Sequence, residues 1–273
     1  CALERGTFDN SFARGSYGGS KLEAAKRSLL AILEQLESND SVGVLLFNHE
    51  THMLHQPSAA TTKAKASIAK KLAEVRPGGG TRLENGFNEG LTTLANAAGD
   101  HPLKRVYFLT DMESGPEDEA AVLQKAKEAA DAALASATYN PGAATVTTAT
   151  PLHTTVIGMG VDLSVKTVEA ISSLRGGKYT SVATVEEFER AVGAEFNHDV
   201  TPMAFDINIT LGNGWTIDRA CGSAELNTLK PGESTAKIAS EFAMPHDANG
   251  RARGGIIAFK LKPPETAADA GNL

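Results

Sequence analysis

Three separate stretches of the chain carry side-chain oxygens of the kind that bind a hard divalent cation. The residues concerned are Asp9, Ser11, Ser16, Thr81 and Asp111. Carboxylate and hydroxyl oxygens, completed by water, are the ligands that Mg²⁺ prefers, and such a set leaves one coordination position open. A carboxylate from a partner protein could fill that position. These residues therefore predict a Mg²⁺ site that binds an acidic side chain of another protein.

Strands and helices alternate along the chain up to Phe196. Nearly continuous apolar runs at 42–47 and 106–109 are typical of strands buried in a parallel sheet, and further strands are expected at 154–159 and 178–182. Amphipathic helices are expected at 20–36, 61–75, 81–94 and 117–137, at a spacing that buries one face of each. This order predicts an α/β fold, a Rossmann-like parallel sheet flanked by helices. Ligands of such sheets bind at the carboxyl ends of the strands, which is where the three loops should meet.

The pattern changes after Phe196. Short alternating segments at 203–211, 215–217, 236–242 and 256–261 predict a small antiparallel β-sandwich. We therefore expect three parts: an α/β domain over 1–197, the sandwich over 198–262 and a disordered tail over 263–273. Residues 138–151 are small and polar, and we expect them to form a surface insertion.

Composition excludes several classes of function. The net charge is −7 and no basic stripe offsets it, which argues against nucleic acid as a partner. No apolar run reaches the length of a membrane span. The two cysteines, Cys1 and Cys221, cannot form a disulfide framework, which favours a reducing compartment. Residues 1–8 lack the apolar run of a central strand, so the sequence leaves open whether the first strand lies upstream of Cys1.

Six segments in order resemble a von Willebrand factor type A domain over about residues 9–196. They are G-S-Y-G-G-S-K-L-E-A-A-K, V-G-V-L-L-F, G-G-G-T-R-L-E-N-G, V-Y-F-L-T-D, T-V-I-G-M-G and G-G-K-Y-T-S-V-A. The resemblance implies a Rossmann-like fold with a metal-ion-dependent adhesion site and a protein-binding role without catalysis. It also implies that Thr81 belongs to the second metal loop and Asp111 to the third. The C-terminal sandwich resembles the β-rich region that follows such domains in some proteins.

The first metal loop departs from the family pattern Asp-x-Ser-x-Ser. Ser16 fits the last serine when the pattern is counted back from the following helix, whereas Asp9 and Ser11 fit when it is counted forward. All three fit only if residues 12–14 are an insertion. If Arg14 lies in the site, its guanidinium would repel a cation or replace it. A weakened or metal-free site therefore stays open as an alternative.

Simpler roles compete with the metal site at two of these positions. Thr81 is also a suitable N-cap for the helix that follows it. Asp111 could cap a helix or form a turn, although a carboxylate directly after a buried strand favours function. The acidic residues 117–119 are expected to favour the start of their own helix.

Two further motifs are weaker. His49 and His55 would share one face of an extended segment roughly 20 Å apart, too far for one zinc ion. The glycines at 158 and 160 lack the third glycine of a dinucleotide fingerprint. We therefore expect neither zinc nor a nucleotide at these places.

The sequence thus predicts a protein-binding module rather than an enzyme, without a small-molecule substrate. Loops 57–62 and 112–117, which surround the predicted site, would set its specificity. One alternative is a scaffold or regulatory domain with a degenerate, metal-free site. A second is a Rossmann-like enzyme, which a deep apolar pocket would favour.

Overall fold

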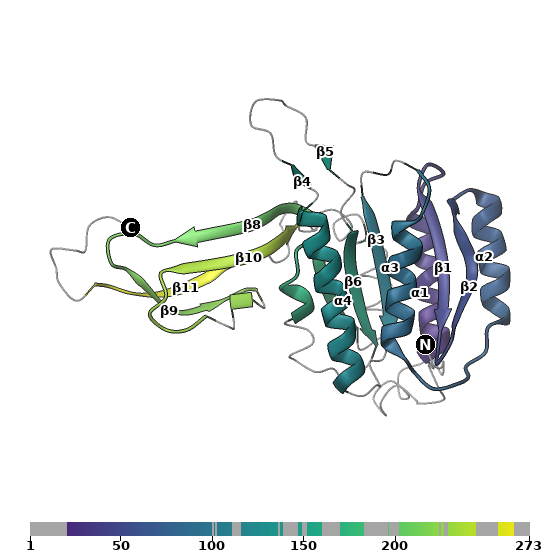
Figure 1. The fold of residues 1–273 in the computed structure, drawn as a ribbon, viewed down its shortest axis with the longest axis horizontal. Helices are drawn as coiled ribbons and strands as arrows, with labels where there is room; N and C mark the ends of the chain where they lie inside the picture. Colours follow the sequence, from purple (N-terminus) through teal and green to yellow (C-terminus); the bar gives the residue numbers. More distant parts are fainter. Residues whose placement is uncertain are drawn as a thin grey trace, which may run out of the picture.

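A computed structural model of the chain describes residues 21–99, 101, 103–110, 116–135, 137–138, 147–148, 152–159, 170–182, 196, 202–223, 225–226, 229–243 and 256–264. Figure 1 shows helices and strands alternating in one part of the chain and strands alone in the C-terminal part. The helices are α1 (Lys21–Gln35), α2 (Thr62–Glu74), α3 (Leu83–Ala95) and α4 (Pro116–Ala135). The strands are β1 (Ser41–Phe47), β2 (Thr51–Ala59), β3 (Lys104–Thr110), β4 (Ala137–Thr138), β5 (Thr147–Thr148), β6 (Leu152–Met159), β7 (Gly177–Val182), β8 (Pro202–Thr210), β9 (Thr216–Cys221), β10 (Thr235–Phe242) and β11 (Ala258–Lys262).

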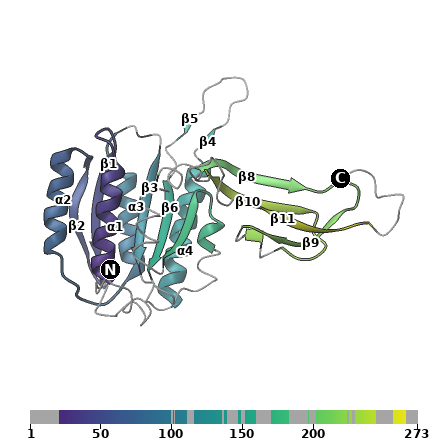
Figure 2. The same ribbon diagram turned by 180° about the vertical axis from the view of Figure 1, so that it is seen from behind.

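A parallel sheet forms the centre of the first part. Its strands lie in the order β3-β6-β7. Helices cover both faces: α3 and α4 lie in front of the sheet in Figure 1, and α1 lies in front when the molecule is seen from behind in Figure 2. The predicted Rossmann-like parallel sheet flanked by helices is therefore confirmed.

The strand expected at 42–47 does form, but its pairing differs from the prediction. It is β1, and it pairs antiparallel with β2 after a tight turn in which Asn48 N donates to Glu50 O at 2.8 Å. Among the described residues no hydrogen-bonded ladder joins β1 to β3. The rings of Phe47 and Phe108 nevertheless stack between these two strands, with centroids 5.0 Å apart. The apolar run thus indicates that the strand is buried between helices. It does not distinguish parallel from antiparallel pairing.

Alternate residues of the parallel strands pack into two different cores. Ile157 faces Leu22 and Ile32 of α1. Its neighbour Val156 packs in the cluster that contains Phe87 of α3. Successive side chains of a strand point to opposite faces, so a sheet covered on both sides needs apolar residues at every position. Each such side chain contributes about 1.5–3 kcal/mol when fully buried.

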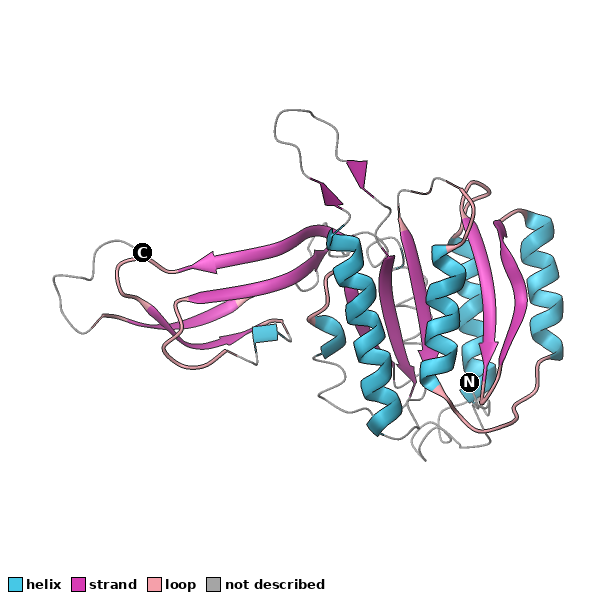
Figure 3. Cartoon of the chain, in the orientation of Figure 1, coloured by secondary structure: helices cyan, strands magenta, loops and turns pink. Residues whose placement is uncertain are grey.

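The C-terminal strands form two antiparallel pairs that share one core. β8 pairs with β10, and β9 pairs with β11. Side chains from all four strands meet in one hydrophobic cluster, which includes Ile217, Ala236 and Ile238. The two pairs are drawn as a separate lobe in Figure 3, and they agree with the predicted small antiparallel sandwich.

Other expectations fall partly outside the described residues. The insertion 138–151 is described only at its ends, where β4 and β5 pair. The predicted tail lies outside beyond residue 264. Cys221 is an exposed free thiol. No helix in the described part of the chain is long and apolar enough to cross a membrane.

Candidate functional site

The starts of three helices gather at one edge of the sheet. α1, α3 and α4 all begin at the end where β3 finishes, the lower end in Figure 1. β3 ends at Thr110, whose side chain is completely buried, so the chain leaves the sheet at this edge immediately before Asp111. This is the carboxyl edge, and it is where ligands of open parallel sheets bind.

The loop of residues 75–82 joins α2 to α3 at this edge, and Asn48 anchors it. Nδ2 of Asn48 donates to the carbonyl of Gly78 at 2.9 Å, and the carbonyl of Asn48 accepts from Arg82 N at 3.0 Å. Gly79 has a φ of +77°, and a Cβ built there would lie 2.4 Å from Nδ1 of His49. Only glycine fits this close approach at positive φ. The loop is thus held against the turn between β1 and β2.

The prediction that Thr81 caps α3 is wrong. The N-cap residue is Arg82, whose side chain makes no capping hydrogen bond. Asp118, from the first turn of α4, takes that role: its Oδ2 accepts from Leu83 N at 2.7 Å and its Oδ1 from Glu84 N at 2.9 Å. Asp118 lies in the first turn of its own helix, as expected, and it also supplies the cap of α3 through a tertiary contact. The capping role of Thr81 is removed, and its half-buried hydroxyl makes no hydrogen bond to another described residue.

The other predicted ligands lie outside the described residues: Asp9, Ser11, Ser16 and Asp111. The structure therefore fixes the position of Thr81 alone among the five. Within the described part of the chain, no three His, Cys, Asp or Glu side chains form a group that could hold a metal ion. The predicted metal ligands include hydroxyls as well as carboxylates, and four of the five lie outside the described residues.

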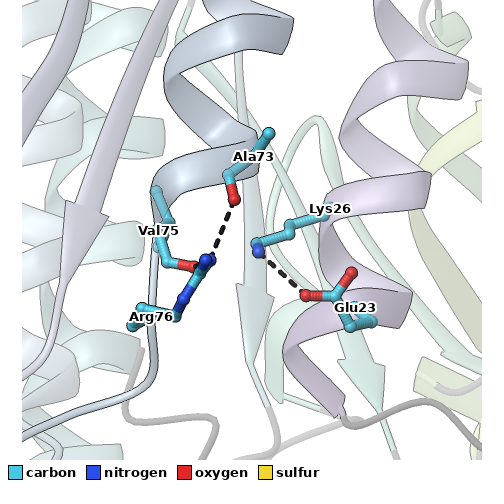
Figure 4. A network of polar contacts seen from close by, with 5 residues as sticks. All are labelled: Glu23, Lys26, Ala73, Val75 and Arg76. Atoms are coloured by element: carbon cyan, nitrogen blue, oxygen red, sulfur yellow. Dashed lines mark hydrogen bonds and ion pairs between the residues drawn. The ribbon is translucent and has the colours of Figure 1, made fainter.

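Helix α1, which follows the first predicted loop, begins beside the end of α2, which leads into the second loop (Figure 4). Nζ of Lys26 lies 2.8 Å from Oε1 of Glu23, one turn earlier in α1 (Figure 4). At the end of α2, Nη1 of Arg76 donates to the carbonyls of Ala73 at 2.9 Å and Val75 at 3.0 Å (Figure 4). Val75 also packs against the α1 core. The segments that leave α2 and enter α1 are therefore positioned together.

The histidines near β1 and β2 are occupied by other contacts. His49 lies in the turn and packs against Gly79. Nε2 of His55 lies 2.9 Å from Oγ of Ser58. Burial lowers the pKa of His55, and the nearby charge of Lys71 lowers it further. The geometry therefore gives these side chains local structural roles.

The opposite edge of the sheet contacts the C-terminal strands, a feature that the sequence patterns did not reveal. The guanidinium of Arg175 lies 4.1 Å from the ring centroid of Phe205, and its Nε lies 3.0 Å from Oδ2 of Asp206. Arg105 and Lys178 approach the ring of Phe242 to 5.4 and 5.3 Å. Arg105 and Lys178 are each the second residue of a parallel strand. A cation at the second position of a strand is therefore the signal in the sequence that could have indicated this contact.

His153 lies at the centre of this contact. Its ring stacks on Phe205 with centroids 5.7 Å apart and is 3% exposed. Burial lowers the pKa of His153 to about 4, and the charges of Arg105 and Arg175 act in the same direction. Gly176 N donates to Oγ of Ser240 in β10 at 2.6 Å, which joins the two parts directly.

Comparison with known proteins finds similarity in the first part of the chain. Residues 9–116 match the family model of the von Willebrand factor type A domain. An uncharacterised protein of the cyanobacterium Synechocystis is 27% identical over 117 residues, which make up 43% of this chain and 27% of that protein. The aligned region thus spans about a quarter of the length of that relative.

Solved structures share the fold at low sequence identity. A von Willebrand factor type A structure from Catenulispora acidiphila superposes with a TM-score of 0.50 at 14% identity, over 88% of this chain and 52% of that one. The hypothetical protein BatB from Bacteroides thetaiotaomicron gives a TM-score of 0.49 at 17% identity, over 70% and 94%. The chain spans about half the length of the first of these, and the likeness concerns the fold alone.

Proposed function

We propose that the first part of the chain is a von Willebrand factor type A domain that acts as a protein-binding module, with a divalent cation, Mg²⁺ in the first place, at its carboxyl edge. The proposed ligands are Asp9, Ser11, Ser16, Thr81 and Asp111. In this arrangement the cation would accept a carboxylate from the partner protein at its open position. The family typically mediates protein interactions, which supports binding rather than catalysis.

The state of Thr81 carries this proposal. Asp118 occupies the two amides that a capping side chain at the start of α3 would bind, so capping does not account for a hydroxyl at Thr81. A hydroxyl on a loop that Asn48 anchors at the carboxyl edge fits a cation ligand. The family match spans all five proposed ligands.

We also propose the division of the chain into the domain over 1–197, the sandwich over 198–262 and a tail over 263–273. The shared core of β8 to β11 supports the second unit. In this proposal the sandwich positions the domain and leaves the carboxyl edge free for a partner.

Calorimetric titration of Mg²⁺ into the metal-stripped chain tests the proposed cation site. We expect saturable binding at one site, abolished by Asp111→Ala and weakened at least tenfold by Thr81→Ala. Thr92→Ala, an exposed threonine of α3, is the matched control and should bind like the original chain. Equal affinity in the Thr81 and Thr92 variants would remove Thr81 from the site.

The spacing of the first loop favours a second candidate, a scaffold domain without a metal. In that case Arg14 would supply the positive charge, and the original chain would show no binding heat with Mg²⁺. Binding restored in Arg14→Ser would then identify Arg14 as the group that excludes the cation.

A further inference from the structure

We propose that Asp118 is a positioning residue for the cation site: its carboxylate holds the start of α3 and thereby the second loop, which carries Thr81. This inference rests on the proposed function. It adds a residue outside the predicted ligand set, with a role that the geometry defines.

Both oxygens of the Asp118 carboxylate bind the start of another helix. Oδ2 accepts from Leu83 N at 2.7 Å and Oδ1 from Glu84 N at 2.9 Å, and both bonds are partly buried. The first amides of a helix have no partners within it, and they carry the positive end of the helix dipole. The bidentate, charged carboxylate therefore accepts from two amides of α3 at once and binds them more tightly than a neutral capping side chain would.

The sequence positions of these groups give the contact its consequence. Leu83 comes two residues after Thr81, and Asp118 comes seven residues after Asp111. The carboxylate thus joins the chain segment directly after Thr81 to the first turn of α4. A change in this contact would move the backbone next to the Thr81 hydroxyl.

Helices α3 and α4, which carry the two sides of this contact, are packed together in the hydrophobic core. Leu83 and Phe87 of α3 are completely buried, and Val122 of α4 is 1% exposed. All three belong to one hydrophobic cluster. Loss of the Asp118 contact should therefore shift the second loop, residues 75–82, and leave the packed helices in place.

The second loop is held from its other side as well. Asn48 binds the carbonyl of Gly78 and the amide of Arg82. Thr81 lies in the chain between these two anchors, and the two amides that Asp118 binds follow it at residues 83 and 84. Two independent clamps on one short loop are typical of a side chain that must be held in one place.

The test compares Asp118→Ala, which removes both acceptors, with Asp118→Asn, which retains one oxygen and the size of the side chain. Asp131→Asn is the matched control, because Asp131 is an exposed carboxylate of the same helix. Mg²⁺ affinity is measured on the full chain by calorimetry. Amide hydrogen exchange at residues 81–84 and the thermal midpoint are measured on the same samples.

We expect Asp118→Ala to weaken Mg²⁺ binding about 10- to 100-fold, the range seen when groups behind metal ligands are removed. Asp118→Asn should have a smaller effect in the same direction, and Asp131→Asn should stay within twofold of the original chain. Exchange at Leu83 and Glu84 should accelerate in the order Ala, Asn, original. If Asp118→Ala does not fold, the Asn variant decides the question.

The outcomes separate this inference from the proposed function. Faster exchange at Leu83 and Glu84 with unchanged Mg²⁺ affinity would make Asp118 a cap alone and overturn its positioning role, while the cation site would stand. An original chain that binds no Mg²⁺ would overturn both. Weaker binding in the Asp118 variants, with the control unchanged, would establish the positioning role.

Discussion

The two edges of the parallel sheet are held by different kinds of contact. At the carboxyl edge, short loops are held by hydrogen bonds from Asn48 and Asp118, and the Thr81 hydroxyl has no described partner. At the amino edge, cations and His153 lie against the rings of Phe205 and Phe242, and the C-terminal strands cover them. Hydrogen bonds fix a loop and leave polar groups available, whereas stacked rings close a surface. The difference supports the proposed binding role of the carboxyl edge, while the amino edge attaches the C-terminal strands.

The largest expected effect comes from removing the ring of Phe242 at the amino edge. The side chain is 9% exposed, and Arg105 and Lys178 both lie against it. Phe242→Ala should reduce the free energy of unfolding by about 3 kcal/mol. The fluorescence of Trp215, the single tryptophan, reports the C-terminal strands, and circular dichroism reports the helices.

Phe242→Leu is the matched control, because it keeps most of the volume and loses only the ring. It should cost about 1 kcal/mol. A loss in Phe242→Ala no greater than that in the Leu variant would show that the contact adds little to stability.

Acid should weaken the same edge through His153. Its pKa in the folded chain is about 4, below the ordinary value of 6.5, so the unfolded chain binds more protons between these values. Stability contributed by the neutral ring is present above pH 6.5 and is lost as pH falls towards 4. Between pH 7 and pH 4.5 the loss should be about 2 kcal/mol.

Urea unfolding at the two pH values measures this loss. His153→Gln should remove about 2 kcal/mol of the difference between them, whereas the exposed His52→Gln should leave it intact. An identical pH dependence in the original chain and His153→Gln would assign the acid sensitivity to other groups.

Arg175 should contribute less. Its ion pair with Asp206 is largely exposed, and exposed pairs contribute little, but its guanidinium also lies over Phe205. Arg175→Met should cost about 1 kcal/mol, mostly through the lost cation–π contact. Asp206→Asn, which breaks only the ion pair, should cost less than half of that by urea unfolding; an equal cost would place the contribution in the pair.

The smallest effect on stability should come from Thr81 at the carboxyl edge. Because Asp118 caps α3, Thr81→Ala should change the free energy of unfolding by less than about 0.5 kcal/mol, whereas Asp118→Ala should cost about 1 kcal/mol. Thermal unfolding of the two variants checks this order. The reverse order would return the capping role to Thr81.

The sequence predicts local features of the molecule better than contacts between distant segments. The apolar run at 106–109 located β3, because burial on both faces leaves a continuous pattern, and the strand expected at 154–159 is β6. Thr61 caps α2, and its hydroxyl accepts from Ala64 N at 3.2 Å, a contact within one helical turn.

Contacts across the fold left no such local pattern. The bonds from Asp118 to α3 span 34 and 35 residues, whereas the local pattern favours the preceding Thr81 as the cap. His153 precedes the predicted strand and was not expected in a buried contact. Of the candidate site, the sequence and the family match supply the ligand types, and the structure adds the position of Thr81 and the clamps that hold its loop.

The attachment of the C-terminal strands at the amino edge also has a mechanical consequence. A partner bound at the carboxyl edge and a tether acting through β8 and β10 would pull on opposite ends of the same strands. The force would run along β3, β6 and β7, nearly at right angles to their ladder. Bonds loaded in shear carry tension together instead of opening one after another, so this sheet is oriented to resist extension.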